Sequence, residues 1–479
     1  MRQDIAAAVR GVDISDWRTV EVEHGDRNIG ILVPPDTREL GMRDFPPLAH
    51  PGEEIRKSIE NPIGTPPLPG ILKAKGKPAE NLAVCIATSD ITRPVPYKGD
   101  AGILDPLLAI LHGAGVRREN VTLLVGTGTH RASTREEKVS MFGERAAAEY
   151  RIIDHACDDE SMLVDIGRTQ SGTEIQINRH FFGADVKIAT GLVESHFMAG
   201  VSAGRKAICP ALVSRRTIER FHSARFLSSP KATNLVLAGN PCHEEALEIA
   251  RKTGVDFIVN TVLNRRLELI GVFSGELERS HEKAVELVRR VVAVPVDEEH
   301  DIVLTHGGYV GINHYQNAKA ACNALPVVRE GGFIILAACE RDEDPVGPAT
   351  YKTLLHLLKM QGPEGYLAAL GNPAWKFTKD QWEPQMWGKV VQKVGEEGII
   401  YCTSYIPERE QRHVPGTAGW DFLPARVFPR DGEATQAMVQ NALVYAYRHP
   451  KWGGRKPSVA FVKEGPYAIP CRRELADRP

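Results

Sequence analysis

From residue 82 onwards, short apolar runs alternate with segments of helical spacing, and this rhythm limits the possible fold more than any other feature. NLAVCIAT, VTLLVGTG and DVKIATG predict strands. Further along, DFIVNTVLN and LELIGVFSG predict two paired strands. Alternation of this kind is typical of a mostly parallel sheet with helices on both faces. We therefore predict an α/β fold.

A second rhythm of the same kind begins at DIVLTHGGY and continues through the helical NAKAACNALPVV. A chain of 479 residues is long for one domain. We therefore expect two α/β domains, with the active site in the cleft between them. The larger, cofactor-binding domain should span residues 1–290 and be rejoined by 431–479, and the smaller should span residues 291–430.

The composition excludes several classes of protein. A formal net charge of −2 gives no electrostatic reason to expect nucleic acid or an anionic membrane as a partner. No apolar run is long enough for a bilayer span, and the mixed, polar start does not support a signal peptide. The eight cysteines are scattered without a CxxC pair, which favours a reducing compartment. We expect a soluble, cytoplasmic protein.

Four polar clusters follow the ends of predicted strands, where ligands collect in open α/β sheets. We therefore expect the four clusters to share one cleft. In the first cluster, SDITRPVP, Arg93 can grip a substrate carboxylate with two hydrogen bonds. The alternative is that Asp90 and Arg93 pair to fix a turn before Pro94.

The second cluster, GTGTHR, combines small residues with a histidine. Gly126 and Gly128 allow the backbone to approach an anion closely, although the spacing lacks the full pattern of a phosphate-binding loop. His130 can act as a general base, because the usual pKa of histidine lies near neutrality. The alternative is a purely structural histidine in a loop.

The third cluster is the densest and contains His196, Lys206 and His222. Lys206 is expected near the start of a helix, whose dipole disfavours the charged amine and makes it more nucleophilic. Phosphate binding or an exposed helix face is the alternative for Lys206. Taken alone, His222 is either a packing histidine or a metal ligand.

The fourth cluster, VGINHYQNAKA, places Gln316 and Lys319 three residues apart on one helix face. Both side chains can therefore point at the same anionic group. A solvated helix surface is the alternative, although the preceding glycines Gly307, Gly308 and Gly311 make it less favourable.

Taken together, these motifs resemble the nickel-dependent lactate racemase family over nearly the whole chain. The family's motifs correspond to Asp90–Arg93, Gly126–His130, the series His196, Lys206 and His222, and the series Tyr315, Gln316 and Lys319. DQWEPQ resembles the family's tryptophan-bearing segment, which implies that Trp382 lies beside the cofactor. The combination is far more specific than any single motif.

The resemblance implies a nickel-pincer nucleotide as cofactor, made by dedicated biosynthesis proteins. It implies that Lys206 is joined covalently to this pyridinium nucleotide and that His222 completes a square-planar nickel site, a geometry that suits Ni(II) with sulfur ligands. Gly126, Gly128 and Trp382 would line the cofactor, and Asp90 would orient it or its neighbours.

The resemblance also implies racemisation or epimerisation of a 2-hydroxy acid through a 2-keto acid. The pair of bases would be His130 and His196, one for each enantiomer. Arg93, Tyr315, Gln316 and Lys319 would hold the substrate.

One departure from the family concerns the loop before Lys206, which reads Ser-Ala-Gly-Arg-Lys here in place of Ser-Gly-Gly-x-Lys. Arg205 can face solvent, touch the nucleotide phosphate, or favour a larger or more anionic substrate. Candidate substrates are lactate, malate, longer or aromatic hydroxy acids, and a sugar acid such as gluconate. This loop and the long N-terminal arm favour a substrate other than lactate. A metal-assisted hydrolase or lyase, or a protein that only binds the cofactor or a hydroxy acid, are the alternative functions.

Overall fold

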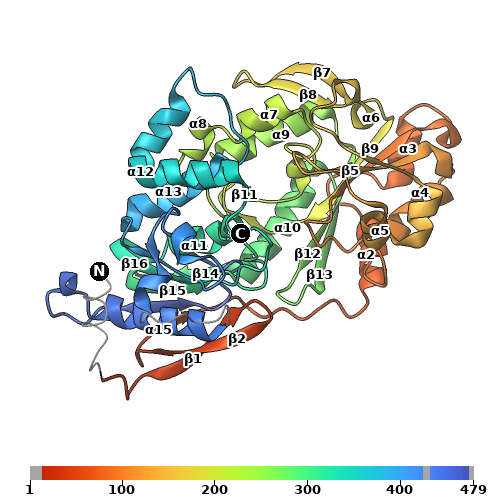
Figure 1. The fold of residues 1–479 in the computed structure, drawn as a ribbon. Coiled ribbons are helices and arrows are strands. Elements are labelled where there is room, and N and C mark those ends of the chain that lie inside the picture. Colours follow the sequence, from red (N-terminus) through yellow and green to blue (C-terminus); the bar gives the residue numbers. More distant parts are fainter. Residues whose placement is uncertain (1–12, 424–431, 474–479) are drawn as a thin grey trace. The chain divides into compact units, whose positions relative to one another are not determined.

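A computed structural model describes residues 13–423 and 432–473 (Figure 1). The chain divides into two compact units. Unit 1 comprises the described parts of Met1–Arg43 and Val292–Pro479, and unit 2 is Asp44–Val291. Each unit has its own sheet and its own hydrophobic core, so each is described by itself.

Unit 2 is built on a six-stranded sheet in which only the edge pair, β12 and β13, is antiparallel. In order across the sheet the strands are β13 (Leu269–Gly275), β12 (Phe257–Leu263), β9 (Val186–Leu192), β4 (Val84–Ser89), β5 (Val121–Gly126) and β6 (Arg151–Asp154). The strands β4, β5 and β9 are mostly apolar and almost wholly buried because helices cover both faces of a parallel sheet. The prediction that β12 and β13 pair is confirmed.

Short and long helices surround this sheet. The helices of unit 2 are α2 (Pro51–Glu60), α3 (Leu68–Ala74), α4 (Leu104–Gly113), α5 (Arg135–Glu149), α6 (Arg179–Phe182), α7 (Arg215–Phe221), α8 (Ala224–Leu227), α9 (Pro241–Thr253) and α10 (Leu277–Val292). Two small antiparallel pairs are added, β7 (Leu163–Arg168) with β8 (Glu174–Asn178) and β10 (Ser195–His196) with β11 (Gly200–Val201). One of the 3-10 turns of this unit, η4, spans Gly204–Ala207.

Unit 1 contains a second six-stranded sheet, in which every pair is parallel. In order the strands are β18 (Thr417–Ala418), β17 (Ile399–Cys402), β16 (Val328–Ala337), β15 (His300–His306), β19 (Val459–Val462) and β3 (Arg38–Leu40). The helices are α11 (His314–Ala324), α12 (Ala349–Gly371), α13 (Trp382–Val394), α14 (Glu408–Gln411) and α15 (Gly432–Tyr447). The α/β prediction is therefore confirmed for both units.

The N-terminal hairpin of β1 (Arg18–His24) and β2 (Arg27–Val33) also belongs to unit 1. Figure 1 shows this hairpin, in red, beside α15, in blue, and the two share one hydrophobic core. A further parallel pair joins β14 (Ala293–Val296) to β20 (Ile469–Arg472).

The expected domain boundaries need one correction. A boundary near residue 290 agrees with the division at 291/292, but the N-terminal arm and the C-terminal segment both pack with residues 292–423. The reason is that β19 pairs with β15 on one side and with β3 on the other, which completes the edge of the unit 1 sheet. An apolar run predicts a strand without indicating which of two similar sheets it joins.

Across residues 13–423 and 432–473, no helix has both the length and the apolar character needed to cross a membrane.

Candidate active site

Three of the four polar clusters lie at the carboxyl ends of neighbouring parallel strands in unit 2. β4 pairs with β5 on one side and with β9 on the other. Asp90 and Arg93 follow β4, His130 follows β5 by a short loop, and His196 follows β9. The fourth cluster follows β15 in unit 1, so it belongs to the other sheet.

Asp90 holds His130 in a defined orientation. Nδ1 of the His130 ring lies 2.6 Å from Oδ2 of the buried Asp90 carboxylate, while Oδ1 accepts hydrogen bonds from the Thr92 hydroxyl and amide. Burial opposes ionisation of Asp90, but the hydrogen bonds from His130 and Thr92 outweigh it and lower the pKa of Asp90. Because Nδ1–H donates to Asp90, Nε2 of the largely exposed His130 ring carries the lone pair of a base.

Arg93 forms an ion pair with Glu194, in which Nη1 donates to the glutamate carboxylate. Both side chains are about one-third exposed, so the pair borders the site without being sealed inside it. In place of the alternative Asp90–Arg93 pair, the structure has two separate pairs, Asp90 with His130 and Arg93 with Glu194. A substrate carboxylate at Arg93 would have to share the guanidinium with Glu194.

The loop after β5 is tight. Gly128 has a φ of +56°, and a Cβ on Gly126 would approach the Ala211 side chain to 2.9 Å. The amide of Gly128 donates to the Ala211 carbonyl, and the amide of His130 donates to Thr127. These N–H groups are therefore engaged by the backbone, and the glycines serve the close approach of the chain to residue 211.

Lys206 and His196 form the second half of the site. Nζ of Lys206 lies 3.2 Å from Nε2 of His196. Nδ1 of His196 accepts from the amides of Met198 and Ala199, so the proton of the neutral ring sits on Nε2. An Nε2–H group can donate to a neutral amine but not to an ammonium group, and the contact therefore fits an uncharged Lys206.

The surroundings of Lys206 favour the uncharged amine for a reason other than the predicted one. Burial first, and then repulsion from Arg93 and Arg205, lower the pKa of Lys206 to about 7. The expected helix is only the one-turn η4, which is too short to supply a helix dipole. Desolvation, and not a helix dipole, is therefore the physical basis on which Lys206 is expected to be nucleophilic.

Arg205 is fully buried and braces the loop that carries Lys206. Its guanidinium donates to the carbonyl oxygens of Ala199 and Val201 at 2.8 and 2.7 Å. The side chain therefore points neither to solvent nor to an open pocket in this structure. Gly204, at φ +50°, must lack a side chain because a Cβ there would meet the His281 ring at 2.6 Å.

His222, the residue predicted to bind a metal, caps the carboxyl end of α7. Its Nδ1 lies 3.1 Å from the Ile218 carbonyl, and donation there leaves Nε2 as the basic nitrogen. Burial and repulsion from Lys206 lower the pKa of His222 to about 3, which keeps the ring in the neutral form that binds metals. The Lys206 amine and the His222 ring both contact the ring of Phe221. Nζ of Lys206 lies 5.2 Å from the centre of this ring, and the centre of the His222 ring lies 4.7 Å from it.

No group of three or more His, Cys, Asp or Glu side chains among the described residues is arranged to hold a metal ion. A nickel-pincer nucleotide, which brings its own ligands, fits a site with one neutral histidine and one nucleophilic lysine.

In unit 1, the fourth cluster lies on α11 beside the start of α13. The indole Nε1 of the buried Trp382 donates to the Tyr315 hydroxyl at 2.8 Å, which joins the two helices. The amide of Gln316 is capped by the Asn313 side chain, so the first turn of α11 is fixed. Gln316 and Lys319 are partly exposed.

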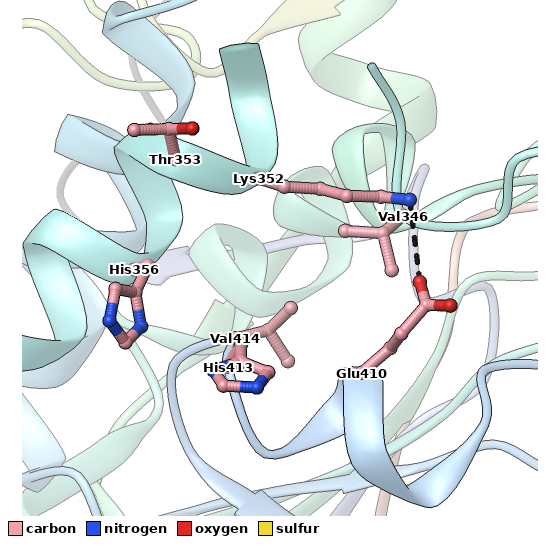
Figure 2. A pocket seen from close by; sticks show the side chains of 7 residues that line it. All are labelled: Val346, Lys352, Thr353, His356, Glu410, His413 and Val414. Carbon is pink, nitrogen blue, oxygen red and sulfur yellow. Dashed lines mark ion pairs between the residues drawn. The ribbon is translucent and has the colours of Figure 1, made fainter. Parts of the chain in front are cut away.

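Figure 2 shows a separate hollow of ≈ 270 Å³ in unit 1. Its walls come from α12, α14 and the loops beside them: Val346, Lys352, Thr353, His356, Glu410, His413 and Val414. Lys352 crosses it to form an ion pair with Glu410 at 3.3 Å. None of the residues predicted from sequence lines this hollow.

Sequence reasoning missed two acidic residues that belong to these clusters. Glu194 lies two residues before His196 in the third cluster and pairs with Arg93. Glu383 follows Trp382 in the DQWEPQ segment and is buried next to the fourth cluster. Both lie inside motifs that were singled out, but only the fold shows which side chains they face.

Known proteins resemble this chain over most of its length. A family model described as the lactate racemase N-terminal domain matches residues 24–234. The lactate racemase of Lactiplantibacillus plantarum is 34% identical over 391 residues, which cover 81% of this chain and 88% of that protein. The lactate racemase of Thermoanaerobacterium thermosaccharolyticum is 30% identical over 338 residues, or 70% of this chain and 76% of that protein.

Two solved structures also resemble this chain. The lactate racemase apoprotein from Thermoanaerobacterium thermosaccharolyticum matches with a TM-score of 0.79 and 25% identity, covering 95% of this chain and 100% of that one. A protein from Thermotoga maritima matches with a TM-score of 0.60 and 19% identity over 90% of this chain and 100% of that one, which shows a shared fold.

The fold and these relatives define an α/β isomerase, more narrowly a racemase. Within that class, the chain belongs to the lactate racemase family. The resemblance inferred from the sequence motifs is thereby confirmed.

Proposed function

We propose that this protein inverts C2 of a 2-hydroxy acid by way of the 2-keto acid, with a nickel-pincer nucleotide attached to Lys206. The observation that carries the proposal is the environment of Lys206. Its amine is desolvated, accepts a hydrogen bond from His196, and contacts the same phenylalanine ring as the neutral His222. An uncharged amine beside a neutral imidazole suits covalent attachment of a group that carries a metal.

The stereochemical logic requires proton transfer at the substrate hydroxyl. A base removes the hydroxyl proton while the hydrogen on C2 leaves with its electron pair, and C2 becomes the planar carbon of a keto acid. Return of that hydrogen to the opposite face, with a proton to the oxygen, gives the other enantiomer. The cofactor, when bound, supplies a reversible acceptor for the hydride.

His130 is best prepared to be a base, because in the neutral ring Asp90 holds the proton on Nδ1 and leaves Nε2 as the acceptor nitrogen. His196 presents an N–H group at Nε2 in this structure and is a donor in that state. Covalent attachment at Lys206 would remove the amine that now accepts from His196, and the Nε2–H group could then give its proton to the substrate oxygen. We assign His130 and His196 to the two faces of C2.

The decisive experiment loads the protein by co-expression with the cofactor-biosynthesis enzymes and measures its intact mass. We expect an organic mass increment on Lys206, together with bound nickel that is lost in His222→Ala. An unmodified Lys206 under these conditions would sink the covalent-cofactor proposal. Nickel without the organic increment would point to a metal-assisted hydrolase or lyase instead.

A chiral screen of the loaded protein then tests turnover and substrate. Lactate is the first probe because the relatives at 30% identity or more are named lactate racemases, and malate, aromatic hydroxy acids and gluconate follow. We expect His130→Ala and Asp90→Asn each to lower kcat about 100-fold or more, since both remove the oriented base. Racemisation that survives both His130→Ala and His196→Ala would contradict the pair of bases.

A further inference from the structure

The helices α11 and α13 of unit 1 meet at a face that is partly acidic. Tyr315 and Lys319 are four residues apart on α11 and therefore share one side of the helix. The hydrogen bond from Trp382 to the Tyr315 hydroxyl places this side against the first turn of α13. Glu383 is the next residue in that turn.

Glu383 is a buried carboxyl group whose neighbours include the Tyr315 hydroxyl. Its side chain is 1% exposed, and neither carboxyl oxygen makes a hydrogen bond of acceptable geometry within the described residues. An ionised carboxylate in such a place is very unfavourable, whereas a protonated carboxyl is tolerated. Burial raises the pKa of Glu383 well above its usual value, and the positive charge of Lys319 and the Tyr315 hydroxyl oppose the shift without cancelling it.

The ionisable groups around Glu383 come from three places. α11 contributes Tyr315, Lys319 and Cys322, α12 contributes Tyr351, and the loop before α13 contributes Asp380. Asp380 raises the pKa of Glu383 further, because two negative charges repel. β16 and β17 also pack on α13, and the ionisable Tyr401 of β17 is bonded to the buried Glu340 instead.

We propose that Glu383 is a positioning residue that must be a neutral acid for the Tyr315–Lys319 face to accept an anionic group of the substrate. The inference rests on the proposed function, which assigns substrate binding to this face. Ionisation of Glu383 would add a negative charge beside Lys319 and repel a substrate carboxylate. Binding of the anion therefore favours the protonated acid, whatever other contacts Lys319 makes.

The protonation state can be tested on the unloaded full-length protein, without any turnover. Infrared difference spectra should show the carbonyl stretch of a protonated carboxyl at neutral pH, and Glu383→Gln should remove this band. The exposed Glu364, changed in the same way, is the matched control and should leave the band in place. Absence of a band assigned to Glu383 would overturn the proposal, even if racemisation is found.

A second readout is the pH dependence of stability. Because the pKa of Glu383 is raised in the folded state, the folded protein holds a proton that the unfolded chain releases above the usual pKa of glutamate. Between the pKa of Glu383 in the unfolded chain and its pKa in the folded protein, this proton makes the folding equilibrium constant fall about tenfold per pH unit as the pH rises. Urea unfolding should show that slope in the wild type relative to Glu383→Gln, and equal slopes would contradict the inference.

The functional consequence is tested on the loaded enzyme with the substrate that the chiral screen identifies. Above the pKa of Glu383, KM should rise by up to about tenfold per pH unit, because ionised Glu383 repels the anionic group of the substrate. The value of kcat should change little, because the loss is confined to substrate binding. Glu383→Gln should abolish this rise and Glu364→Gln should keep it. If Glu383→Gln does not fold, Glu383→Met supplies a neutral side chain of similar length. A rise in KM that persists in the Gln or Met variant would overturn the proposal.

The two hypotheses fail in different ways. If the protein turns over no 2-hydroxy acid but the infrared band and the unfolding slope are present, the neutral acid is retained and the proposed function is wrong. If racemisation is found but the band is absent, the proposed function stands and the role of Glu383 is wrong.

Discussion

At the scale of single residues, Ala203 carries a backbone cost. It has a φ of 55° and a ψ of −161°, a region that L side chains rarely adopt. A residue held there costs about 1–3 kcal/mol. The backbone adopts this conformation because the loop turns between the carbonyl groups that Arg205 binds and the residue that carries the Lys206 amine.

We therefore predict that Ala203→Gly stabilises the protein by about 1 kcal/mol, since relief of strain exceeds the entropy that glycine adds to the unfolded chain. Urea denaturation of the unloaded protein measures the change. Ala207→Gly, at a position without positive φ, is the control and should destabilise. A loss of stability in Ala203→Gly would show that the positive φ is not strained in solution.

The amine of Lys206 should be the most reactive lysine of the unloaded protein near neutral pH. With a pKa of about 7, its reaction with an acylating reagent should rise about tenfold per pH unit below pH 7 and level off above it. Ordinary lysines level off only near pH 10, because their usual pKa is about 10.4. Competitive labelling with peptide mass analysis measures each site separately.

The buried environment is the cause to be tested. Phe221→Ala opens the wall beside the amine, so the plateau of Lys206 labelling should move to higher pH. A plateau near pH 10 in the wild type would mean that the amine is solvated, and the proposed attachment chemistry would lose its main support.

At the scale of elements, α5 begins with a capping box soon after His130. The Thr134 hydroxyl accepts from the Glu137 amide, and the Glu137 carboxylate accepts from the Thr134 amide. We predict that Thr134→Ala lowers the free energy of unfolding by about 1 kcal/mol, because one amide at the helix start loses its partner. Thermal or urea unfolding measures this loss. Thr134→Ser keeps the oxygen and should retain most of the stability, and an equal loss in both variants would exclude the cap as the cause.

The buried parallel strands are the elements that the sequence predicts best. Continuous apolar runs such as Val84–Ser89 and Val121–Gly126 identify buried parallel strands, and the polar residues after them then fall at one edge of the sheet. Asp90, His130 and His196 were found in this way. Their mutual contacts were not, since a hydrogen bond such as that of Asp90 with His130 depends on the course of two loops.

The expected helix at Lys206 failed for a local reason. Ala203 and Gly204 both have positive φ, which a helix cannot contain, and only a single 3-10 turn follows. The pattern around Arg205 gave no sign of this. A buried arginine that binds backbone carbonyls looks the same in sequence as one exposed to solvent.

The burial of Arg205 also removes a reason to predict a substrate other than lactate. The altered loop was one reason to favour a substrate other than lactate, with Arg205 near the substrate or the nucleotide. Arg205 is instead buried against the backbone of its own loop, and the N-terminal arm completes the sheet of unit 1. Neither feature now distinguishes lactate from a larger hydroxy acid.

At the scale of the whole molecule, unit 2 is continuous in sequence and self-contained. Its core draws only on residues within 44–291, and its sheet needs no strand from outside. We predict that a fragment of residues 44–291 folds cooperatively and keeps the low-pH reactivity of Lys206. Circular dichroism during urea unfolding and the labelling assay measure both properties.

The matched fragment 292–479 should fail to fold, because it lacks β1, β2 and β3. These strands supply the edge next to β19 and the apolar residues that cover α15. Addition of residues 1–43 should restore its structure. A well-folded 292–479 fragment would contradict the division of the chain described above.

The pairing of β3 with β19 also determines when unit 1 can fold during synthesis. The ribosome delivers the N-terminal hairpin and β3 first, and α15 and β19 only after nearly all the rest of the chain. At about 5–20 residues per second, the wait is on the order of tens of seconds. Throughout that time unit 2 can fold, whereas Val22, Ile31 and Val33 of the hairpin lack their final neighbours. These apolar residues can therefore bind a chaperone early in synthesis. The chaperone would be released when α15 and β19 are made and unit 1 folds.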